Sequence, residues 1–147
     1  MMATRRRKTS ASRPNEVFLS HAHQDADFVP RLADDLRRHN VPVWFSERNI
    51  VGAQQWMDEI GQALDRCDWL VVVLTPAAVA SVWVKREVGF ALNEQHYGDR
   101  VIPLLLKKCV PKKLAWPLAT IQTIDARPYD EGLRKLLAIW GISYRGI

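Results

Sequence analysis

The sequence predicts an α/β protein in which a doubly wound, mainly parallel sheet of about five strands is covered by helices on both faces. Short apolar runs alternate with segments of helical periodicity, and the links between them are short. The run over residues 69–74 is too short and too rich in valine for a buried helix, so we expect a central strand there. With 147 residues, 48% of them hydrophobic, the chain has the length and composition of one soluble globular domain.

Periodicity predicts two strands and two helices in the first half of the chain. Phe28, Leu32 and Leu36 recur at spacings of four, which predicts a helix with a buried stripe and with Asp25 as its N-cap. The runs EVFLS and VPVWF predict strands. The expected elements are a strand over residues 16–20, a helix over 26–39, a strand over 41–45 and a helix from 56 toward 66.

The second half continues this alternation after the central strand. Ser81 precedes a helical pattern that carries Trp83 and Glu87 on one face, and Gly98 is expected to end it. Open α/β sheets bind ligands at the carboxyl ends of their strands, which is where Glu87 is expected. The other expected elements are this helix to about residue 96, a strand over 101–106, an irregular lysine- and proline-containing segment over 107–120, a strand over 121–124 and a helix over 129–140.

The net charge of +5 comes from the N-terminal segment. Residues 1–14 contain five of the 21 basic residues and no acidic one, so residues 15–147 carry 16 residues of each sign. We therefore expect residues 1–14 to be a disordered basic tail and residues 15–147 to form a domain that does not bind nucleic acid. Contact of the tail with phosphates or anionic lipid, or a targeting role, remains an alternative.

Composition also indicates the compartment. No apolar run approaches the roughly 18 residues needed to span a bilayer, so no membrane span is expected. Cys67 and Cys109 do not make a disulfide framework, and no cysteine or histidine cluster has the spacing of metal ligands. We expect a cytoplasmic protein without a metal site.

Three other classes of α/β protein are disfavoured because their motifs are missing. HAHQD follows the first strand, where a phosphate-binding fold would carry GxxxxGK or GxGxxG. A phospho-acceptor receiver domain would need an acidic pair there, and the chain has Ser20 and His21. No serine lies in a GxSxG elbow, which disfavours a hydrolase triad. His39 and His96 are expected to be solvated residues at helix ends.

Three motifs in register point to a known family. The segments FLSHAHQD, VPVWFSERNIVGAQQWMDEI and CDWLVVVLTPAAVASVWVKREVGFAL resemble, in order and spacing, the motifs of the Toll/interleukin-1 receptor (TIR) domain family, particularly its bacterial branch. The resemblance covers residues 16 to about 140. Its most specific part is the pattern SxWxxxE, formed by Ser81, Trp83 and Glu87.

The resemblance implies a flavodoxin-like fold and cleavage of NAD+ between nicotinamide and ribose, with Glu87 as the catalytic residue and NAD+ as substrate rather than cofactor. That reaction passes through an oxocarbenium-like transition state, which a carboxylate stabilises. Nicotinamide is already a cationic leaving group, so one carboxylate suffices. The competing interpretation is that Glu87 is a surface charge paired within its own helix.

The resemblance also suggests residues that contact the substrate. Trp83 and Trp44 are placed to stack on an aromatic ring, or else to pack in the core. Ser20, His21 and Asp25 belong to the loop after the first strand, where polar groups would meet ribose or phosphate. For Asp25, a role as helix cap only is equally open.

The loop over residues 46–55 resembles the BB loop of the family, which often gates the pocket and mediates head-to-tail assembly. Ser46 stands where TIR domains commonly carry an aspartate, and it is included among the expected substrate-binding residues. The resemblance implies activation by self-association through this loop.

Several functions fit the resemblance. The first is an NAD+ glycohydrolase or ADP-ribosyl cyclase in bacterial antiphage defence or signalling, acting alone or with other TIR or effector proteins. The second is a non-catalytic adaptor that binds TIR domains, and the third is a virulence factor that mimics host TIR domains. Glu87 favours the first, because an adaptor needs no carboxylate in that pocket.

Overall fold

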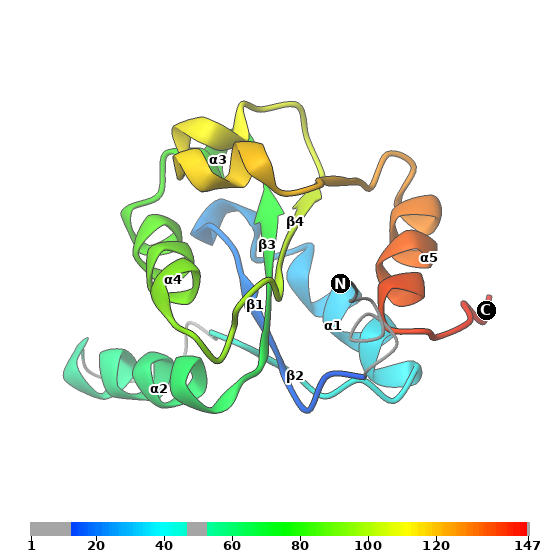
Figure 1. Ribbon diagram of the computed structural model, residues 1–147, viewed down its shortest axis with the longest axis horizontal. Coiled ribbons are helices and arrows are strands. Elements are labelled where there is room, and N and C mark those ends of the chain that lie inside the picture. The colour runs from blue at the N-terminus through cyan, green and yellow to red at the C-terminus, as the bar shows by residue number, and fades with distance from the viewer. Residues whose placement is uncertain (1–12, 47–52, 147) are drawn as a thin grey trace, which may run out of the picture.

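The computed structural model describes residues 13–46 and 53–146, which form a parallel sheet between two layers of helices (Figure 1). The strands lie in the order β2-β1-β3-β4-β5, and every neighbouring pair is parallel. The strands are β1 (Val17–Ser20), β2 (Val43–Phe45), β3 (Trp69–Leu74), β4 (Val101–Leu105) and β5 (Ile124–Asp125). The prediction of a five-stranded, doubly wound parallel sheet is confirmed.

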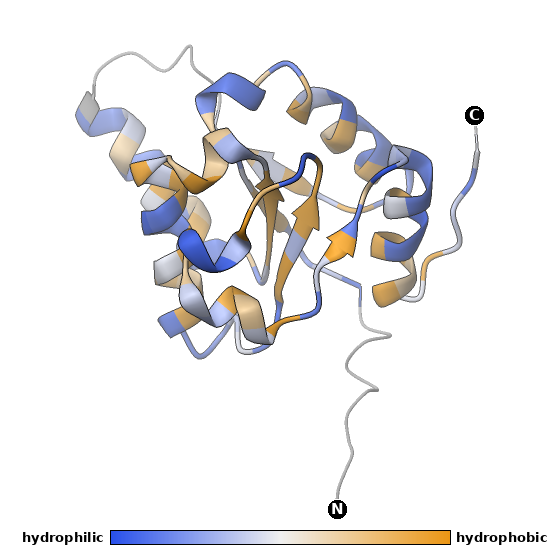
Figure 2. Ribbon diagram, turned by 90° about the horizontal axis from the view of Figure 1, so that it is seen from above, coloured by the Kyte–Doolittle hydropathy of each residue, from blue (hydrophilic) through white to orange (hydrophobic). Residues whose placement is uncertain are grey.

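Among the described residues, two α-helices cover one face of the sheet and three cover the other. The helices α1 (Val29–Arg38) and α5 (Tyr129–Ile139) contribute to one hydrophobic cluster. The helices α2 (Ala53–Arg66), α3 (Pro76–Val79) and α4 (Val82–Asn93) contribute to the other. Figure 2 shows apolar strands at the centre with polar residues on the outer faces of the helices. Each helix therefore buries one stripe against the sheet.

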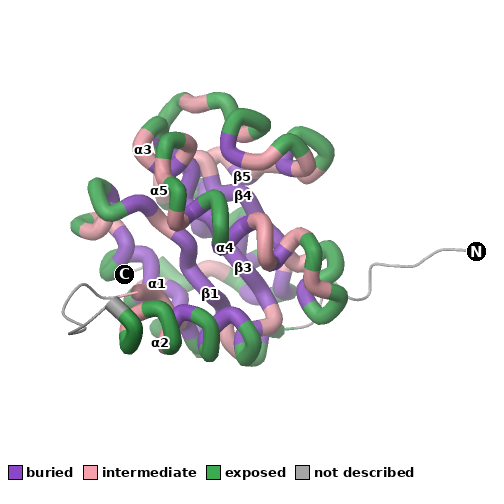
Figure 3. The backbone as a smooth tube through the Cα atoms, turned by 90° about the vertical axis from the view of Figure 1, so that its left-hand side faces the viewer, coloured by how far each residue is buried: buried purple, intermediate pink, exposed green. Residues whose placement is uncertain are grey.

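The central strand is β3, as predicted. All six of its residues are buried, since β1 and β4 pair with its two edges and helices cover both faces. Figure 3 shows this strand and its neighbours buried inside a shell of more exposed helical surface. Its valines suit a strand that packs on both sides.

The start of α1 differs from the prediction. Asp25 was expected to cap a helix beginning at residue 26, whereas α1 begins at Val29 and has no side-chain cap. Residues His23–Asp25 form a separate 3-10 turn, and Pro30 then occupies the first turn of α1, where its missing N–H costs nothing. The Asp25 carboxylate instead accepts a hydrogen bond from Thr75.

Other boundaries shift by a few residues. α4 ends at Asn93 rather than near residue 96, and Gly98 takes a positive φ of 54° beyond it. The last strand covers Ile124–Asp125 instead of residues 121–124, because a 3-10 helix over Trp116–Thr120 occupies the chain up to Ile121. The short helix α3 was not predicted.

The prediction that His39 is solvated is wrong. This histidine is 1% exposed, its Nδ1 lies 2.7 Å from the Asp35 carbonyl, and its Nε2 accepts a hydrogen bond from the Arg145 N–H. The C-terminal segment therefore packs over the end of α1. His96, by contrast, is exposed as expected.

The described residues bear on two further expectations, which concern the basic N-terminal tail and membrane spans. Residues 1–12 of the expected basic tail lie outside the described residues, whereas the Arg13 guanidinium donates to the His39 carbonyl. Within the described ranges, no helix is long and apolar enough to cross a membrane.

Candidate active site

Glu87 lies in the second turn of α4, facing the end of β1. Ser81 caps this helix by accepting a hydrogen bond from the Val84 N–H, which fixes where the helix begins. The Glu87 side chain is only 6% exposed. Ser20, the last residue of β1, donates a 2.6 Å hydrogen bond from its hydroxyl to Glu87 Oε1. Two segments that are 67 residues apart thus meet at one carboxylate.

Burial controls the protonation of Glu87. Removal of its carboxylate from water raises its pKa to about 7, although the hydrogen bond from Ser20 acts in the opposite direction. None of the ion pairs among the described residues involves Glu87. The interpretation of Glu87 as a surface charge is therefore wrong.

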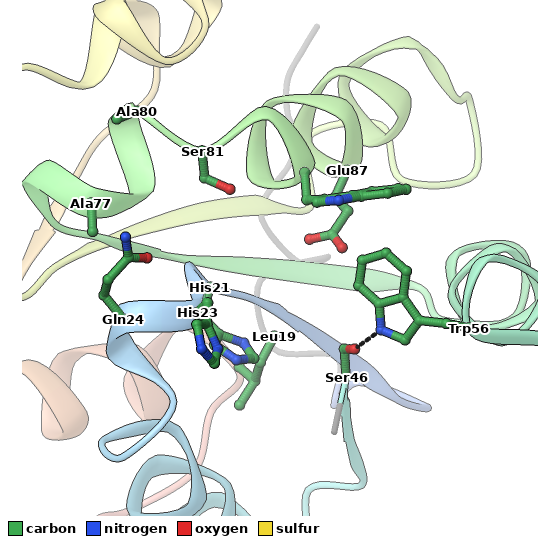
Figure 4. Close-up of a pocket in the computed structure, with 11 residues that line it drawn as sticks. Leu19, His21, His23, Gln24, Ser46, Trp56, Ala77, Ala80, Ser81 and Glu87 are labelled. Carbon is green, nitrogen blue, oxygen red and sulfur yellow. Dashed lines mark hydrogen bonds between the residues drawn. The ribbon is translucent and has the colours of Figure 1, made fainter. Parts of the chain in front are cut away.

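A cavity of about 240 Å³ opens beside Glu87 at the carboxyl ends of the strands (Figure 4). The Glu87 carboxylate points into it, and Ser46 and Trp56 lie on the opposite side. The cavity is lined by residues of β1, of the turn after it, of the end of β2 and of α2, α3 and α4: Leu19, His21, His23, Gln24, Ser46, Trp56, Ala77, Ala80, Ser81, Trp83 and Glu87.

Two tryptophans form an aromatic corner of this cavity. The Trp56 and Trp83 rings lie nearly perpendicular, at 81°, with their centroids 4.4 Å apart. Trp56 Nε1 donates a 2.7 Å hydrogen bond to Ser46 Oγ, and the Arg86 guanidinium lies 5.1 Å from the Trp83 ring centroid. Ser46 therefore holds the Trp56 indole in place. The acceptor is a neutral hydroxyl, at the position where an aspartate carboxylate was expected from the resemblance to TIR domains.

The predicted site residues are distributed unevenly around the cavity. His21, Ser46, Trp83 and Glu87 line it, and Ser20 reaches it through Glu87. Trp44 does not line the cavity; its ring packs 5.0 Å from that of Phe18 in the core, the alternative left open for it.

Sequence reasoning missed Trp56, together with His23 and Gln24, as cavity residues. Trp56 continues the helical period of Ile60 and Leu64, so its pattern predicted a place in the core stripe. Because this tryptophan lies in the first turn of α2, next to Ser46 at the end of β2, it reaches the cavity. The only available signal was its position just after the loop over residues 46–55.

Asp25 also lies outside the cavity lining, and it connects the turn after β1 to the start of α3. Thr75 Oγ1 donates a 2.6 Å hydrogen bond to Asp25 Oδ2 and accepts one from the Ala78 N–H. Both Asp25 and Thr75 are buried. The link holds together the two segments that contribute Gln24 and Ala77 to the cavity.

We expect Thr75→Val to lower the free energy of unfolding by about 2 kcal/mol, because it leaves a buried carboxyl group without its hydroxyl donor. Urea unfolding at pH 7 measures this change. Thr120→Val is the matched control, since the Thr120 hydroxyl also donates a hydrogen bond, to the Pro117 carbonyl, but is exposed. Equal stability of the Thr75 and Thr120 variants would contradict a structural role for the link.

The site is suited to a cationic, flat group. A carboxylate attracts positive charge, and the faces of two indoles favour both aromatic rings and cations. No cluster of three or more metal-ligating side chains occurs within residues 13–46 and 53–146. In the lining formed by these residues, Glu87 is the single acidic group.

Comparison with known proteins identifies the family. A family model described as the TIR domain matches residues 17–137. The chain belongs to the TIR domain family. The fold is also that of the TIR domain of the Toll-related receptor TRR-2 from Hydra magnipapillata, with a TM-score of 0.64, 18% identity, and coverage of 78% of this chain and 86% of that one.

Two similar bacterial proteins carry names that describe an activity. The first is "NAD(+) hydrolase TcpC" of Escherichia coli, 29% identical over 90 residues, which are 60% of this TIR chain and 29% of that protein. The second is "2' cyclic ADP-D-ribose synthase BtTIR" of Bacteroides thetaiotaomicron, 27% identical over 88 residues, 59% of this chain and 31% of that one. The chain thus spans about three tenths of the length of these relatives.

Proposed function

We propose that this TIR domain cleaves NAD+ at the bond between nicotinamide and ribose, with Glu87 as the catalytic carboxylate. The observation that carries the proposal is the buried Glu87 carboxylate, which points into a cavity with an aromatic corner formed by Trp56 and Trp83. The names of the relatives TcpC and BtTIR support it, since both describe NAD+ or a cyclic product of it.

The proposed reaction needs one ionised carboxylate and no general acid. The C–N bond breaks and its electron pair leaves with nicotinamide, which becomes neutral, while positive charge develops at the ribose carbon. Glu87 stabilises this charge, and the Trp83 and Trp56 rings hold the departing nicotinamide. Water then adds to the ribose and releases a proton, giving ADP-ribose, or a hydroxyl of the same molecule adds and gives a cyclic isomer.

The hydrogen bond from Ser20 orients the carboxylate and favours its ionised form. At neutral pH a substantial fraction of Glu87 is ionised, because its pKa of about 7 lies near the working pH. A cationic substrate beside the carboxylate increases this fraction further. His21 and Ser81 line the remaining cavity wall, where ribose hydroxyls can bind.

The direct test is to incubate the full chain with NAD+ at high protein concentration and to separate the products by chromatography. We expect nicotinamide together with ADP-ribose or a cyclic isomer, and the identity of the second product distinguishes hydrolysis from cyclisation. Absence of nicotinamide, even in crowded solutions that promote assembly, would refute the enzyme and favour an adaptor that acts through TIR–TIR binding.

The cavity is small relative to the substrate. Pockets that enclose drug-sized ligands have volumes of roughly 300–1,000 Å³, whereas this one has about 240 Å³. It can enclose the nicotinamide end of NAD+, and the adenosine end must lie beyond its mouth. Ser46, the first residue of the loop over residues 46–55, and Trp56, which follows the loop, both line the cavity, whereas most of the loop lies outside the described residues. A neighbouring copy that contacts this loop would lie beside the cavity and complete the site.

Activation by self-association therefore predicts that specific activity rises with protein concentration. We expect the rate of nicotinamide release to increase more steeply than linearly with enzyme concentration, in step with oligomers detected by analytical ultracentrifugation. A constant specific activity from a monomeric chain over the same range would contradict this part of the proposal and leave the role of Glu87 untouched.

We propose a cellular role that is compatible with this chemistry. Depletion of NAD+ or synthesis of a cyclic signal takes place in the cytoplasm, where NAD+ is available, and both suit bacterial antiphage defence or signalling. Cys67 and Cys109 are free thiols, which fits a reducing compartment.

A further inference from the structure

The segment from Lys107 to Thr120 takes no part in the cavity. It follows β4 at the carboxyl end of the sheet and contains two 3-10 helices, Pro111–Lys113 and Trp116–Thr120. Figure 1 shows this segment, in yellow, crossing above the ends of β3 and β4. We call residues 107–120 the lysine segment.

The lysine segment carries positive charge that is not compensated. Its four lysines, at positions 107, 108, 112 and 113, are all exposed. The ion pairs among the described residues include none of them. The sequence contains no acidic residue from position 100 to position 124. Residues 15–147 are formally neutral only with these four lysines included, and the rest of the domain has 12 basic and 16 acidic residues. The positive charge is therefore a local property of this surface.

Two apolar side chains are exposed beside these lysines. Trp116 is 74% exposed and Val110 is 45% exposed. In contrast, Leu114 and Leu118 are buried and belong to the hydrophobic cluster that includes residues of α3 and α4. The segment is therefore anchored to the core by its leucines while it presents a tryptophan and a valine to solvent. Trp116 is the most exposed of the large apolar side chains among the described residues, and tryptophan is enriched at binding interfaces and at membrane surfaces.

We propose that the lysine segment docks the domain on an anionic lipid surface. Tryptophan partitions to the boundary between lipid headgroups and acyl chains, and lysines near it bind phosphate headgroups while their methylene stems stay apolar. Nucleic acid is the less suitable partner, because the segment has no arginine to form bidentate phosphate contacts and offers a single exposed aromatic ring for stacking. Val110, next to the lysines, gains from burial at the acyl-chain boundary but not from contact with nucleic-acid phosphates.

The test is co-sedimentation of the full chain with vesicles of phosphatidylglycerol and phosphatidylcholine at low ionic strength. We expect binding to these vesicles and little binding to vesicles of phosphatidylcholine alone. Neutralising one lysine near an anionic surface weakens partitioning by roughly fivefold, so Lys112→Gln/Lys113→Gln should weaken it about 25-fold. Trp116→Ala should weaken it about tenfold, through loss of apolar burial.

The matched control is Lys85→Gln/Lys135→Gln, which removes the same charge from exposed positions on α4 and α5. It should bind vesicles nearly as well as the wild-type chain, and circular dichroism should show all variants folded. Equal loss in the control would assign the binding to net charge and overturn the proposal. Binding that survives unchanged in the Lys112/Lys113 and Trp116 variants would also overturn the proposal. That result is expected if the N-terminal tail, rather than the lysine segment, binds the vesicles. Binding to an oligonucleotide but not to anionic vesicles would overturn it in favour of a nucleic-acid surface.

Discussion

Glu87→Gln is expected to lower nicotinamide release by roughly a thousandfold or more while making the folded domain more stable at pH 8. Glutamine preserves the shape of the side chain and can still accept the hydrogen bond from Ser20, but it cannot carry the charge that stabilises the transition state. Removing one group that stabilises a transition state electrostatically usually lowers the rate by roughly a hundredfold to a thousandfold. We expect a loss at the upper end of this range, because Glu87 is the one acidic group in the described cavity lining.

The gain in stability follows from the pKa of Glu87, which burial raises from 4.5 in the unfolded chain to about 7 in the folded one. Below pH 4.5 the group is protonated in both states and has no effect. As the pH rises from 4.5 to 7, the unfolded chain loses its proton first, and folding becomes less favourable. Above pH 7 the penalty is complete and amounts to about 3 kcal/mol, which glutamine does not incur.

Chemical unfolding at pH 8 and pH 4 measures this difference, which should be largest at pH 8 and vanish at pH 4. Glu131→Gln is the control, since Glu131 is an exposed glutamate in the first turn of α5. We expect this variant to keep both activity and stability. Full activity in Glu87→Gln would disprove the catalytic role, and a lower stability at pH 8 would disprove the argument from burial.

The second large effect concerns pH. If ionised Glu87 is the active form, kcat/KM for NAD+ should be constant well above pH 7 and fall about tenfold per pH unit well below it. The hydrogen bond that Ser20 donates lowers the pKa of Glu87, so Ser20→Ala should raise it. The pH profile of kcat/KM for Ser20→Ala therefore shifts to higher pH, and its kcat/KM returns to the wild-type value only at the alkaline end of the range.

The measurement is the initial rate of nicotinamide release at subsaturating NAD+ over the range from pH 5 to pH 9. Reactions with Glu87→Gln supply the background of uncatalysed cleavage. A profile that is independent of pH would rule out ionisation of Glu87 as a requirement. An unchanged midpoint in Ser20→Ala, together with a uniform loss of rate, would assign Ser20 to packing rather than to control of the carboxylate.

Much of the fold could be predicted because local patterns depend on neighbouring residues in the chain. The valine-rich run of β3 has to be buried on both faces, and the spacing of Trp83 and Glu87 puts them on one face of α4. Likewise, alternation along β2 places Trp44 opposite Val43 and Phe45, in the two different hydrophobic clusters. Element boundaries were less accurate, as α1 and β5 show, since 3-10 turns next to prolines carry little periodic signal.

The candidate site was predictable only in part. The pattern SxWxxxE pointed to Glu87, which lies at the cavity together with His21, whereas Asp25 does not line it. The hydrogen-bond partners of individual polar groups were not predicted. Asp25 had the local pattern of a helix cap, and its hydroxyl partner Thr75 lies 50 residues away. His39 had the pattern of a solvated helix end, yet the Arg145 N–H binds it from 106 residues away.

The sequence was thus sufficient for the alternation of strands and helices, the family and the carboxylate. The hydrogen bond between Ser20 and Glu87, the contact of Trp56 with Trp83 and the anchoring of Trp56 by Ser46 depend on the folded chain. They arise because the order β2-β1-β3 brings the carboxyl ends of distant strands to one edge of the sheet. A hydrogen bond requires atoms within about 3 Å of each other, and only the packing of the helices on the sheet sets such distances between segments that are far apart in the chain.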